Sequence, residues 1–309
     1  MGRRLFAMLL MTGAAGAQLL AARVCAEPPP SRSPAEVEAV LAMAPRPPDA
    51  GDLRELHILL LADVKDHGPG EHDYPLWQEQ WRTLLANNPA CAPKIHVATA
   101  SRWPSEGQFA KADLLVMYCY PGTPKGRTFS RAQIEQLAEF IACGGGFVPV
   151  HSATYTVGDL SQEDGQRLLS VTGLMFAKSI QYRHGPIELK IADVGHPICL
   201  GLPKTIHFVD EPYWPPSGDV SQVQVLATSD ENTAAGAEQR EPQPMFWTHL
   251  HGQGRVFGCV MGHYGATFDD PFFRILLLRG MVWTTGESPY RLDRLAGVQI
   301  ADCKLQNEE

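Results

Sequence analysis

The alternation of short apolar runs with helical patterns constrains the fold of this chain more than any other feature. Residues 56–62 (LHILLLA) and 112–119 (ADLLVMYC) are almost continuously apolar, as expected of parallel strands that are covered on both faces. Apolar side chains recur at helical spacing in residues 74–86 and 130–142, and Ser130 stands where a helix cap is expected. Strands that alternate with helices predict a parallel sheet with right-handed crossovers.

The second half of the chain contains more strand patterns than helical ones. A last helix is predicted over residues 271–285. The further strands predicted along the chain are residues 94–98, 147–150, 187–191, 223–227, 244–247 and 255–261. We therefore expect an α/β fold, a flavodoxin-like three-layer sandwich with extra strands in its C-terminal half.

The first 26 residues have the pattern of a cleavable signal peptide. Arg3 and Arg4 precede an apolar run over residues 5–20, and Val24 and Ala26 supply small residues before the expected cleavage site. A membrane anchor is the alternative, but the run is short and is broken by Arg23. A lipoprotein is disfavoured for the same reason, because an arginine does not suit the residues before a modified cysteine. The leader predicts export, to a periplasm or to the outside.

The remaining chain divides into three parts. Residues 27–52 form a Pro- and Ala-rich linker with too little apolar surface to offset its ordering entropy, although residues 37–43 suit a short helix. Residues 53–289 have a common size for one α/β domain. Residues 290–309 carry scattered charges and are expected to form a tail on the surface.

Charge and cysteine content exclude several classes of function. The formal net charge is −8 and the basic residues are dispersed, so the footprint of a nucleic-acid-binding protein is missing. The cysteines after the leader form no CxxC pair, which disfavours thiolate zinc sites and thioredoxin-type chemistry. These cysteines are Cys91, Cys119, Cys143, Cys199, Cys259 and Cys303. A disulfide is compatible with export, but the sequence does not select its partners.

Polar, titratable residues follow several of the predicted strands. In open parallel sheets, ligands bind beyond the carboxyl ends of the strands, so these residues are candidates for a site. The loop after the first strand contributes Asp63, Lys65, Asp66, His67 and His72, and later strands contribute Tyr120, His151 and His263. We expect the loop residues and Tyr120 to bind substrate and the two later histidines to carry chemistry.

A second group of candidates lies in the β-rich half. The acidic pair Asp210-Glu211 is flanked by Tyr213 and other aromatic residues, which indicates partial burial and therefore a partner such as a metal, a histidine or a substrate hydroxyl. Tyr213 and Trp247 are candidate substrate contacts, since aromatic faces beside polar acceptors suit sugar rings. Three further sites carry less weight: Tyr182 and His184 in a loop, His249 on a strand, and His196 in what is expected to be a structural turn.

These motifs resemble the ThuA-like (trehalose utilisation) family, which is related in fold to the class I glutamine amidotransferases. The matching pieces are residues 65–75 (KDHGPGEHDYP), 144–147 with 151–152, 196–197, 210–213, and 254–257 with 262–263. The resemblance implies a role in carbohydrate metabolism, often alongside dehydrogenases that make 3-keto-glycosides. It also implies a divalent metal such as zinc in some members, at positions that match His151, Glu211 and His263.

One departure from the amidotransferases bears on the reaction. Their nucleophilic cysteine sits at a sharp turn after a strand, where this chain has His151 and Ser152, and Cys143 lies before that strand. A Cys-dependent amidotransferase is therefore not expected. A serine hydrolase built on Ser152 is also disfavoured, because adjacent residues on a strand point to opposite faces.

Two main hypotheses for the function remain open. The first is an exported enzyme that cleaves a sugar or 3-keto-glycoside as a lyase or hydrolase, with His151 or His263 as base and Glu211 as metal ligand or acid. The second is a carbohydrate-binding or interaction module that kept the fold without the chemistry. A metal-dependent hydrolase of another ester or amide is a weaker third. No nucleotide cofactor is expected, and the oligomeric state is not predicted.

Overall fold

Eleven strands are found in the part of the chain that the structure describes. The computed structural model describes residues 31–122, 128–156, 158–177, 179–234 and 236–298. The strands are β1 (Leu56–Ala62), β2 (Ile95–Ser101), β3 (Leu114–Tyr118), β4 (Gly146–Pro149), β5 (Gln181–Tyr182), β6 (Gly185–Ile191), β7 (Thr205–Asp210), β8 (Tyr213–Trp214), β9 (Gln224–Asn232), β10 (Arg240–His251) and β11 (Gly254–Cys259). Nine of them form one sheet in the order β2-β1-β3-β4-β11-β10-β9-β6-β7, and β5 pairs with β8.

The sheet has a parallel part and an antiparallel part. Strands β2, β1, β3, β4 and β11 are parallel neighbours. With β11 as the fifth parallel strand, their order is the 2-1-3-4-5 order of the flavodoxin-like fold, which confirms the predicted fold class. Strands β10, β9, β6 and β7 continue the sheet as antiparallel neighbours. β6, β9 and β10 are extra strands that were predicted for the C-terminal half, whereas β7 was not predicted.

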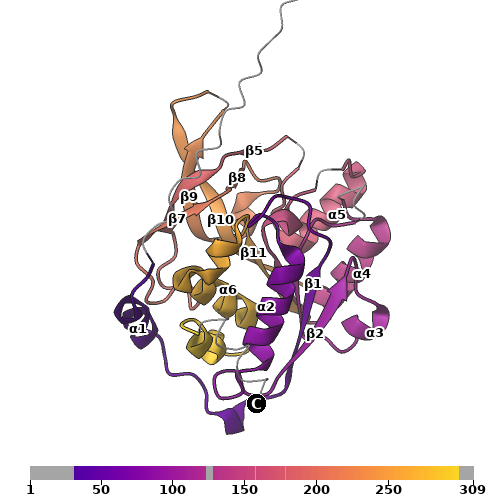
Figure 1. Ribbon diagram of the computed structural model, residues 1–309. Coiled ribbons are helices and arrows are strands. Elements are labelled where there is room, and N and C mark those ends of the chain that lie inside the picture. The colour runs from indigo at the N-terminus through magenta and orange to yellow at the C-terminus, as the bar shows by residue number, and fades with distance from the viewer. Residues whose placement is uncertain (1–30, 123–127, 157, 178, 235, 299–309) are drawn as a thin grey trace, which may run out of the picture.

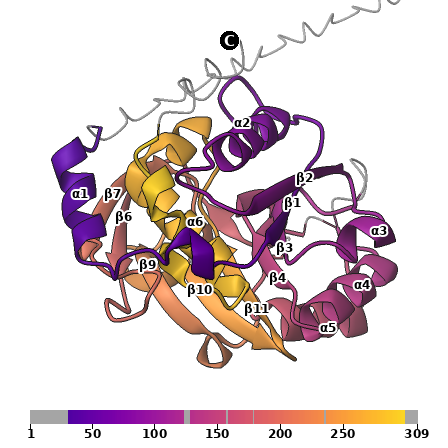
Figure 2. The ribbon, with the colours of Figure 1, turned by 90° about the horizontal axis from the view of Figure 1, so that it is seen from below.

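Helices cover both faces of the sheet (Figures 1 and 2). Helices α2 and α6 pack on one face, while α3, α4 and α5 lie on the other. The helices are α1 (Pro34–Ala42), α2 (Tyr74–Ala86), α3 (Glu106–Phe109), α4 (Arg131–Ala142), α5 (Gln162–Thr172) and α6 (Pro271–Thr284). Short 3-10 turns are η1 (Ala50–Asp52), η2 (His151–Thr154), η3 (Val220–Gln222), η4 (Gly265–Asp269) and η5 (Pro289–Leu295). Ser130 caps α4 in a capping box with Gln133, as its position predicted.

The segment that was predicted to be a linker packs on the domain. Val37 and Val40 on α1 are buried. The Arg32 guanidinium pairs with the Asp270 carboxylate at 3.1 Å and lies 4.9 Å from the centre of the Phe272 ring. The short helix expected over residues 37–43 is therefore present as α1, and the expectation of too little buried surface is wrong where these apolar and charged contacts anchor the segment.

The predicted C-terminal tail is also partly buried. Tyr290, Leu292 and Leu295 in η5 are buried, and Asp293 forms two short contacts with Arg279 of α6, at 2.9 and 2.8 Å. The expectation of a surface tail is therefore wrong for residues 290–298. The predicted leader and Cys303 lie outside the described residues.

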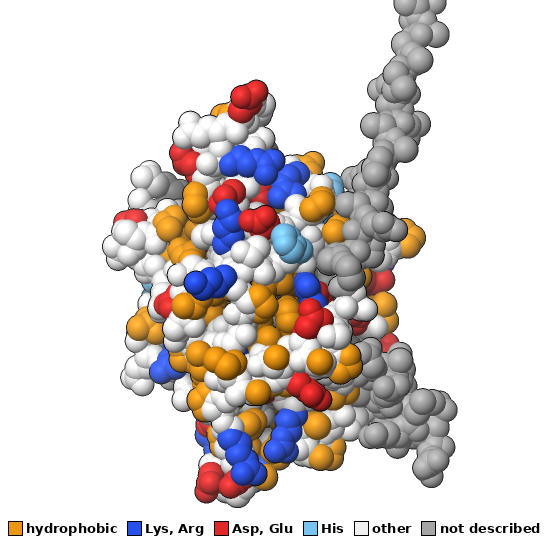
Figure 3. All heavy atoms as spheres, turned by 90° about the vertical axis from the view of Figure 1, so that its left-hand side faces the viewer, with side chains coloured by type: hydrophobic (Ala, Val, Ile, Leu, Met, Phe, Trp, Pro, Cys, Tyr) orange, Lys and Arg blue, Asp and Glu red, His pale blue; other side chains and the backbone are white. Residues whose placement is uncertain are grey.

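Three further observations concern the length of the helices, the state of the cysteines and the charge of the surface. Within the described ranges, no helix combines the length and apolar character needed to cross a membrane. The five cysteines there are all free thiols. On the face drawn in Figure 3, basic, acidic and hydrophobic side chains of the described residues are interspersed.

Candidate functional site

Loops that follow three parallel strands meet at the carboxyl edge of the sheet. His72 comes from the loop after β1, His151 directly follows Val150 after β4, and His263 lies in the loop after β11. The first and third loops are tied together by their backbones: His72 N–H donates to the His263 carbonyl at 3.0 Å, and Gly265 N–H donates to the Gly70 carbonyl at 2.9 Å. The parallel half of the sheet therefore brings together three histidines that are far apart in the sequence.

The antiparallel half contributes the carboxylate. Glu211 follows β7, and the preceding residue, Asp210, is fully buried. The Asp210 carboxylate accepts hydrogen bonds from the backbone N–H of His263 at 2.9 Å, from the N–H of Gly262 at 3.1 Å and from the Thr267 hydroxyl. Asp210 thus fastens the edge strand to the loop after β11, which places Glu211 beside His263.

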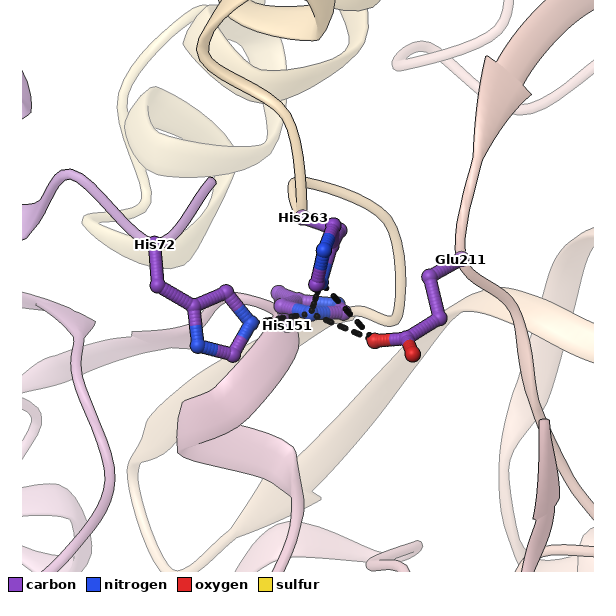
Figure 4. A group of neighbouring side chains, drawn as sticks. All are labelled: His72, His151, Glu211 and His263. Atoms are coloured by element: carbon purple, nitrogen blue, oxygen red, sulfur yellow. Dashed lines mark hydrogen bonds and ion pairs between the residues drawn. The ribbon is translucent and has the colours of Figure 1, made fainter. Parts of the chain in front are cut away.

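Four ligand-type atoms converge in this cluster (Figure 4). His151 Nε2 lies 2.9 Å from His72 Nε2, 3.3 Å from His263 Nδ1 and 3.4 Å from Glu211 Oε2. His263 Nδ1 lies 2.9 Å from Glu211 Oε2. The three histidine side chains are at most 1% exposed and that of Glu211 is 8% exposed. We call these four residues the His/Glu cluster.

Hydrogen bonds on the far side of two rings determine which nitrogen faces the cluster. His151 Nδ1–H donates to the Val260 carbonyl at 2.7 Å, and His72 Nδ1–H donates to the Asp66 carboxylate at 3.0 Å. With Nδ1 acting as the donor, Nε2 of each ring is the atom directed at the cluster. These two nitrogens lie 2.9 Å apart, so a proton or a metal ion is needed between them, and the hydrogen bonds on the far side of both rings are of the kind that support metal ligands.

The backbone at His151 is strained. His151 has a φ of 49°, and His72 has a φ of 43°. Non-glycine residues in this left-handed region cost on the order of 1 kcal/mol each, and such strain gathers at functional sites. His151 opens η2, so it occupies a sharp turn directly after β4. The sequence-based picture of Ser152 on a continuing strand is wrong, since residues 151–154 form a turn.

Burial and neighbouring groups perturb the pKa values in the cluster. Burial, together with the nearby His151 and His263, lowers the pKa of His72 to about 3 despite its bond to Asp66. Burial raises the pKa of Glu211, but its hydrogen bonds with His151 and His263 outweigh this, so the pKa falls well below its usual range. Burial lowers the pKa of His263, yet the bond and charge of Glu211 raise it overall. In the absence of a metal, Glu211 thus favours the protonated form of His263.

Most of the predicted substrate-binding residues surround this cluster. Asp66 accepts a hydrogen bond from His67 at 2.8 Å as well as from His72. The Tyr213 hydroxyl donates to His151 Nε2 at 2.8 Å, and the Tyr120 ring lies 5.8 Å from the His72 ring.

Three of the predicted substrate-binding residues have different surroundings in the structure. Lys65 Nζ donates to the Glu71 carbonyl at 2.6 Å and pairs with the Asp73 carboxylate, so it braces the loop. Asp63 accepts a hydrogen bond from Val64 N–H in the same loop. Trp247 is fully buried and donates to the Thr172 carbonyl at 2.9 Å, which corrects its prediction as a substrate contact.

Several residues at the site received little or no weight in the sequence. His184 Nε2 lies 3.2 Å from Glu211 Oε1, and Tyr264 directly follows His263 and contacts His184. The Glu71 carboxylate lies 3.8 Å from His263 Nε2. The sequence feature that could have identified Glu71 and Tyr264 is their position next to the predicted site residues His72 and His263. In contrast, His249 contacts only backbone carbonyls and His196 lies in a turn, as expected.

The donor set of the cluster fits a divalent transition metal. His72, His151, Glu211 and His263 each offer one ligand atom, and these atoms lie within 4.8 Å of one another. Three imidazole nitrogens with one carboxylate oxygen are a ligand set that zinc accepts in tetrahedral sites. Because two of the rings are also oriented by second hydrogen bonds, this buried group could hold a metal ion without rebuilding its surroundings.

Comparisons with known proteins agree with this picture. No curated protein matches the chain. A ThuA-like protein from Parabacteroides merdae is 21% identical with a TM-score of 0.55, covering 76% of this chain and 92% of that one. A ThuA-like protein from Bacteroides uniformis is 17% identical with a TM-score of 0.56, covering 80% and 99%. These two structures share the fold. The model of the ThuA family, described as trehalose utilisation, matches residues 72–284, and the chain therefore belongs to the ThuA family.

Proposed function

We propose that this protein holds a divalent metal in the His/Glu cluster and uses it to cleave an oxidised glycoside of the 3-keto class. The observation that carries this proposal is the convergence of three imidazole nitrogens and one carboxylate oxygen in a buried group at the edge of the sheet. The family is described by trehalose utilisation, which supports a sugar as the substrate.

The cluster extends the ligand set that the sequence suggested. His151, Glu211 and His263 were the expected ligands, and His72 adds a fourth, held by the Asp66 carboxylate. A divalent cation bound there supplies a Lewis acid for a ketone oxygen and for the negative charge that develops on it. The four side chains hold their ligand atoms in place before substrate arrives, so little reorganisation is needed.

Cleavage of a 3-keto-glycoside by elimination needs only proton transfers beside such a site. The ketone acidifies the neighbouring C–H at C2, a base takes that proton, and the C1–O bond breaks with its electron pair. The departing oxygen then takes a proton. Because His151 and His263 turn their nitrogens into the cluster, we now assign proton transfer to polar groups at its rim. His67 and Glu71 have part-exposed side chains there.

The rim also offers contacts that suit a sugar ring. The part-exposed rings of Tyr120 and Tyr155 lie 6.1 Å apart, and Tyr155 lies 5.5 Å from the buried Tyr213, which stacks on His151. Aromatic faces pack against the C–H face of a sugar, while carboxylates and imidazoles bind its hydroxyl groups. This combination of apolar faces and polar acceptors supports a carbohydrate rather than an apolar ligand.

The experiment combines metal analysis with turnover. We expect purified protein to contain zinc or a related metal, and to release the aglycone from 3-keto-trehalose. A chelator should abolish this activity and added zinc should restore it. His151→Asn, which tolerates the left-handed backbone, and Glu211→Gln should lose both metal and activity, while His249→Ala should retain both.

The outcomes separate the enzyme from the alternative function. Saturable binding of the keto-sugar without turnover, in protein loaded with metal, would favour a carbohydrate-binding module. Activity that survives both substitutions would refute the assigned site.

We also propose that the protein is exported, as its leader predicts. The supporting observation is the order of charged, apolar and small residues over residues 1–26. Fractionation of expressing cells, with N-terminal sequencing of the mature chain, tests this. A mature chain that begins near Glu27 outside the cytoplasm is expected, and an intact leader on cytoplasmic protein would contradict it.

A further inference from the structure

The two oxygens of the Glu211 carboxylate face different partners. Oε2 points into the cluster, 2.9 Å from His263 Nδ1 and 3.4 Å from His151 Nε2. Figure 4 shows that the other oxygen turns away from these rings. That oxygen, Oε1, lies 3.2 Å from Nε2 of His184, a residue outside the His/Glu cluster. One oxygen is thus directed to the ligand set and the other to a separate histidine.

Hydrogen bonding determines the orientation of the His184 ring. His184 Nε2 and Glu211 Oε1 are in close contact at 3.2 Å, and in such a contact the carboxylate can only accept. His184 Nδ1 then accepts a hydrogen bond from the Tyr264 hydroxyl, 3.0 Å away. Tyr264, His184 and Glu211 are thus linked in a chain of polar contacts.

Ring packing keeps this chain beside the cluster. The His184 ring meets the His263 ring edge to face, with centres 5.0 Å apart, and Tyr264 meets His263 in the same way at 4.7 Å. Tyr264 also pairs through its backbone with Glu71, in the loop after β1. His184 directly precedes β6. The chain therefore joins the antiparallel half of the sheet to the loops after β1 and β11, which supply His72 and His263.

We propose that His184 is a positioning residue that restrains Glu211 to offer a single oxygen to the metal, with Tyr264 fixing the ring of His184. The inference rests on the proposed metal in the His/Glu cluster. With Oε1 in contact with His184 Nε2, Glu211 presents only Oε2 beside the three histidines. Without His184, the carboxylate is free to rotate, and either binds through both oxygens or turns out of the site.

Cobalt(II) binding tests this without measuring activity. Cobalt absorbs strongly in the visible region in four-coordinate sites and weakly when a fifth or sixth ligand is added. We expect His184→Ala and His184→Asn to weaken cobalt affinity 10- to 100-fold, as loss of a supporting hydrogen bond does, and to reduce the visible absorption per bound ion. His184→Gln should restore both properties, because its amide N–H reaches the position of Nε2.

Two further variants complete the test. Tyr264→Phe should weaken the affinity by a smaller factor, since the ring of His184 keeps its packing on His263. His249→Ala removes a histidine that contacts only backbone carbonyls and should change neither affinity nor spectrum. If the alanine variant fails to fold, His184→Asn and Tyr264→Phe carry the comparison.

The outcomes that would overturn the inference are distinct from failure of the proposed function. Wild-type affinity and spectrum in His184→Asn would show that Glu211 needs no support. A loss in His184→Gln equal to that in His184→Asn would make the imidazole itself a ligand. If the wild-type protein binds no cobalt at all, the metal centre fails, and the role given to His184 fails with it.

Discussion

Two groups of buried charged side chains in the described part of the chain are built in opposite ways. In the first, the Arg279 guanidinium faces both oxygens of Asp293, at 2.9 and 2.8 Å, and the Leu200 carbonyl at 2.6 Å. Its donors point at acceptors. In the second, the His/Glu cluster, imidazole nitrogens and a carboxylate oxygen point at one another, with His72 Nε2 and His151 Nε2 2.9 Å apart.

The difference separates a structural role from a site. The Arg279–Asp293 pair is complete because its charges cancel and its hydrogen bonds are made within the protein, so it needs no ligand. In the His/Glu cluster, two imidazole Nε2 atoms and a carboxylate oxygen face one another, and the protons that Tyr213 and His263 offer do not separate the two Nε2 atoms. A buried group of this kind is stabilised by a cation, and its stability should depend on what is bound.

The largest effect is expected from breaking the complete pair. Asp293→Ala leaves the Arg279 charge buried without a partner, which should lower the free energy of unfolding by about 3–5 kcal/mol. The double substitution Arg279→Met with Asp293→Leu should cost less, because no charge is left unpaired. Urea unfolding with and without zinc measures both. A loss in Asp293→Ala below about 1 kcal/mol would contradict a structural role for the pair.

The metal should provide the next largest effect, and only in the wild-type cluster. Zinc at about a thousandfold excess over its Kd should stabilise the protein by about 4 kcal/mol, because it binds the folded state alone. His263→Gln removes one ligand and should lose most of this gain, while Asp293→Ala should keep it. Thermal unfolding over a zinc titration checks this. Equal zinc stabilisation in wild type and His263→Gln would refute the difference between the two groups.

Much of the fold was predictable because its signals are local. The apolar run of β1 and the helical period of α2 predicted residues 56–62 and 74–86, the same bounds that the structure has. The segments before and after the domain were predicted poorly, since the packing of Val40 and Asp293 depends on partners far away in the sequence. Composition alone does not show such contacts.

The site was predictable where it follows the ends of parallel strands. That rule located His151 and His263, whereas His184 precedes an antiparallel strand, to which the rule does not apply. Trp247 was misplaced because residues 245–248 are all buried, so alternation along β10 gives no sign of which face meets the cleft. The pairing of Glu71 with Tyr264 arises only when two loops meet.

A smaller effect should follow from weakening the support of one ligand. Asp66→Asn replaces the carboxylate that holds His72 Nδ1–H, which should reduce zinc affinity 10- to 100-fold, or about 1.4–2.8 kcal/mol. Asp63→Asn is the matched control in the same loop, where the carboxylate bonds only to Val64 N–H, and should leave the affinity unchanged. Competition with a chromophoric chelator measures both. If Asp66→Asn and Asp63→Asn bind zinc with the same affinity, Asp66 does not support the His/Glu cluster.

The smallest effect should come from the titration of His72 in metal-free protein. It is measured as the change in the free energy of unfolding per pH unit. Its pKa is about 3 when folded and near 6.5 when unfolded, so between these values the unfolded chain binds the extra proton. Stability should therefore rise with pH up to about 6.5, by at most about 1.4 kcal/mol per unit from this group, and be lost as pH falls toward 3.

His72→Asn isolates this term, because asparagine tolerates the left-handed backbone at this position and does not titrate. Urea unfolding with chelator present, from pH 4.5 to 8, should give a shallower pH dependence below pH 6.5 in the variant than in the wild type, and parallel curves above it. Parallel curves over the whole range would mean that His72 is not held neutral by burial. The cluster would then lack the facing acceptors that distinguish it from the Arg279–Asp293 pair.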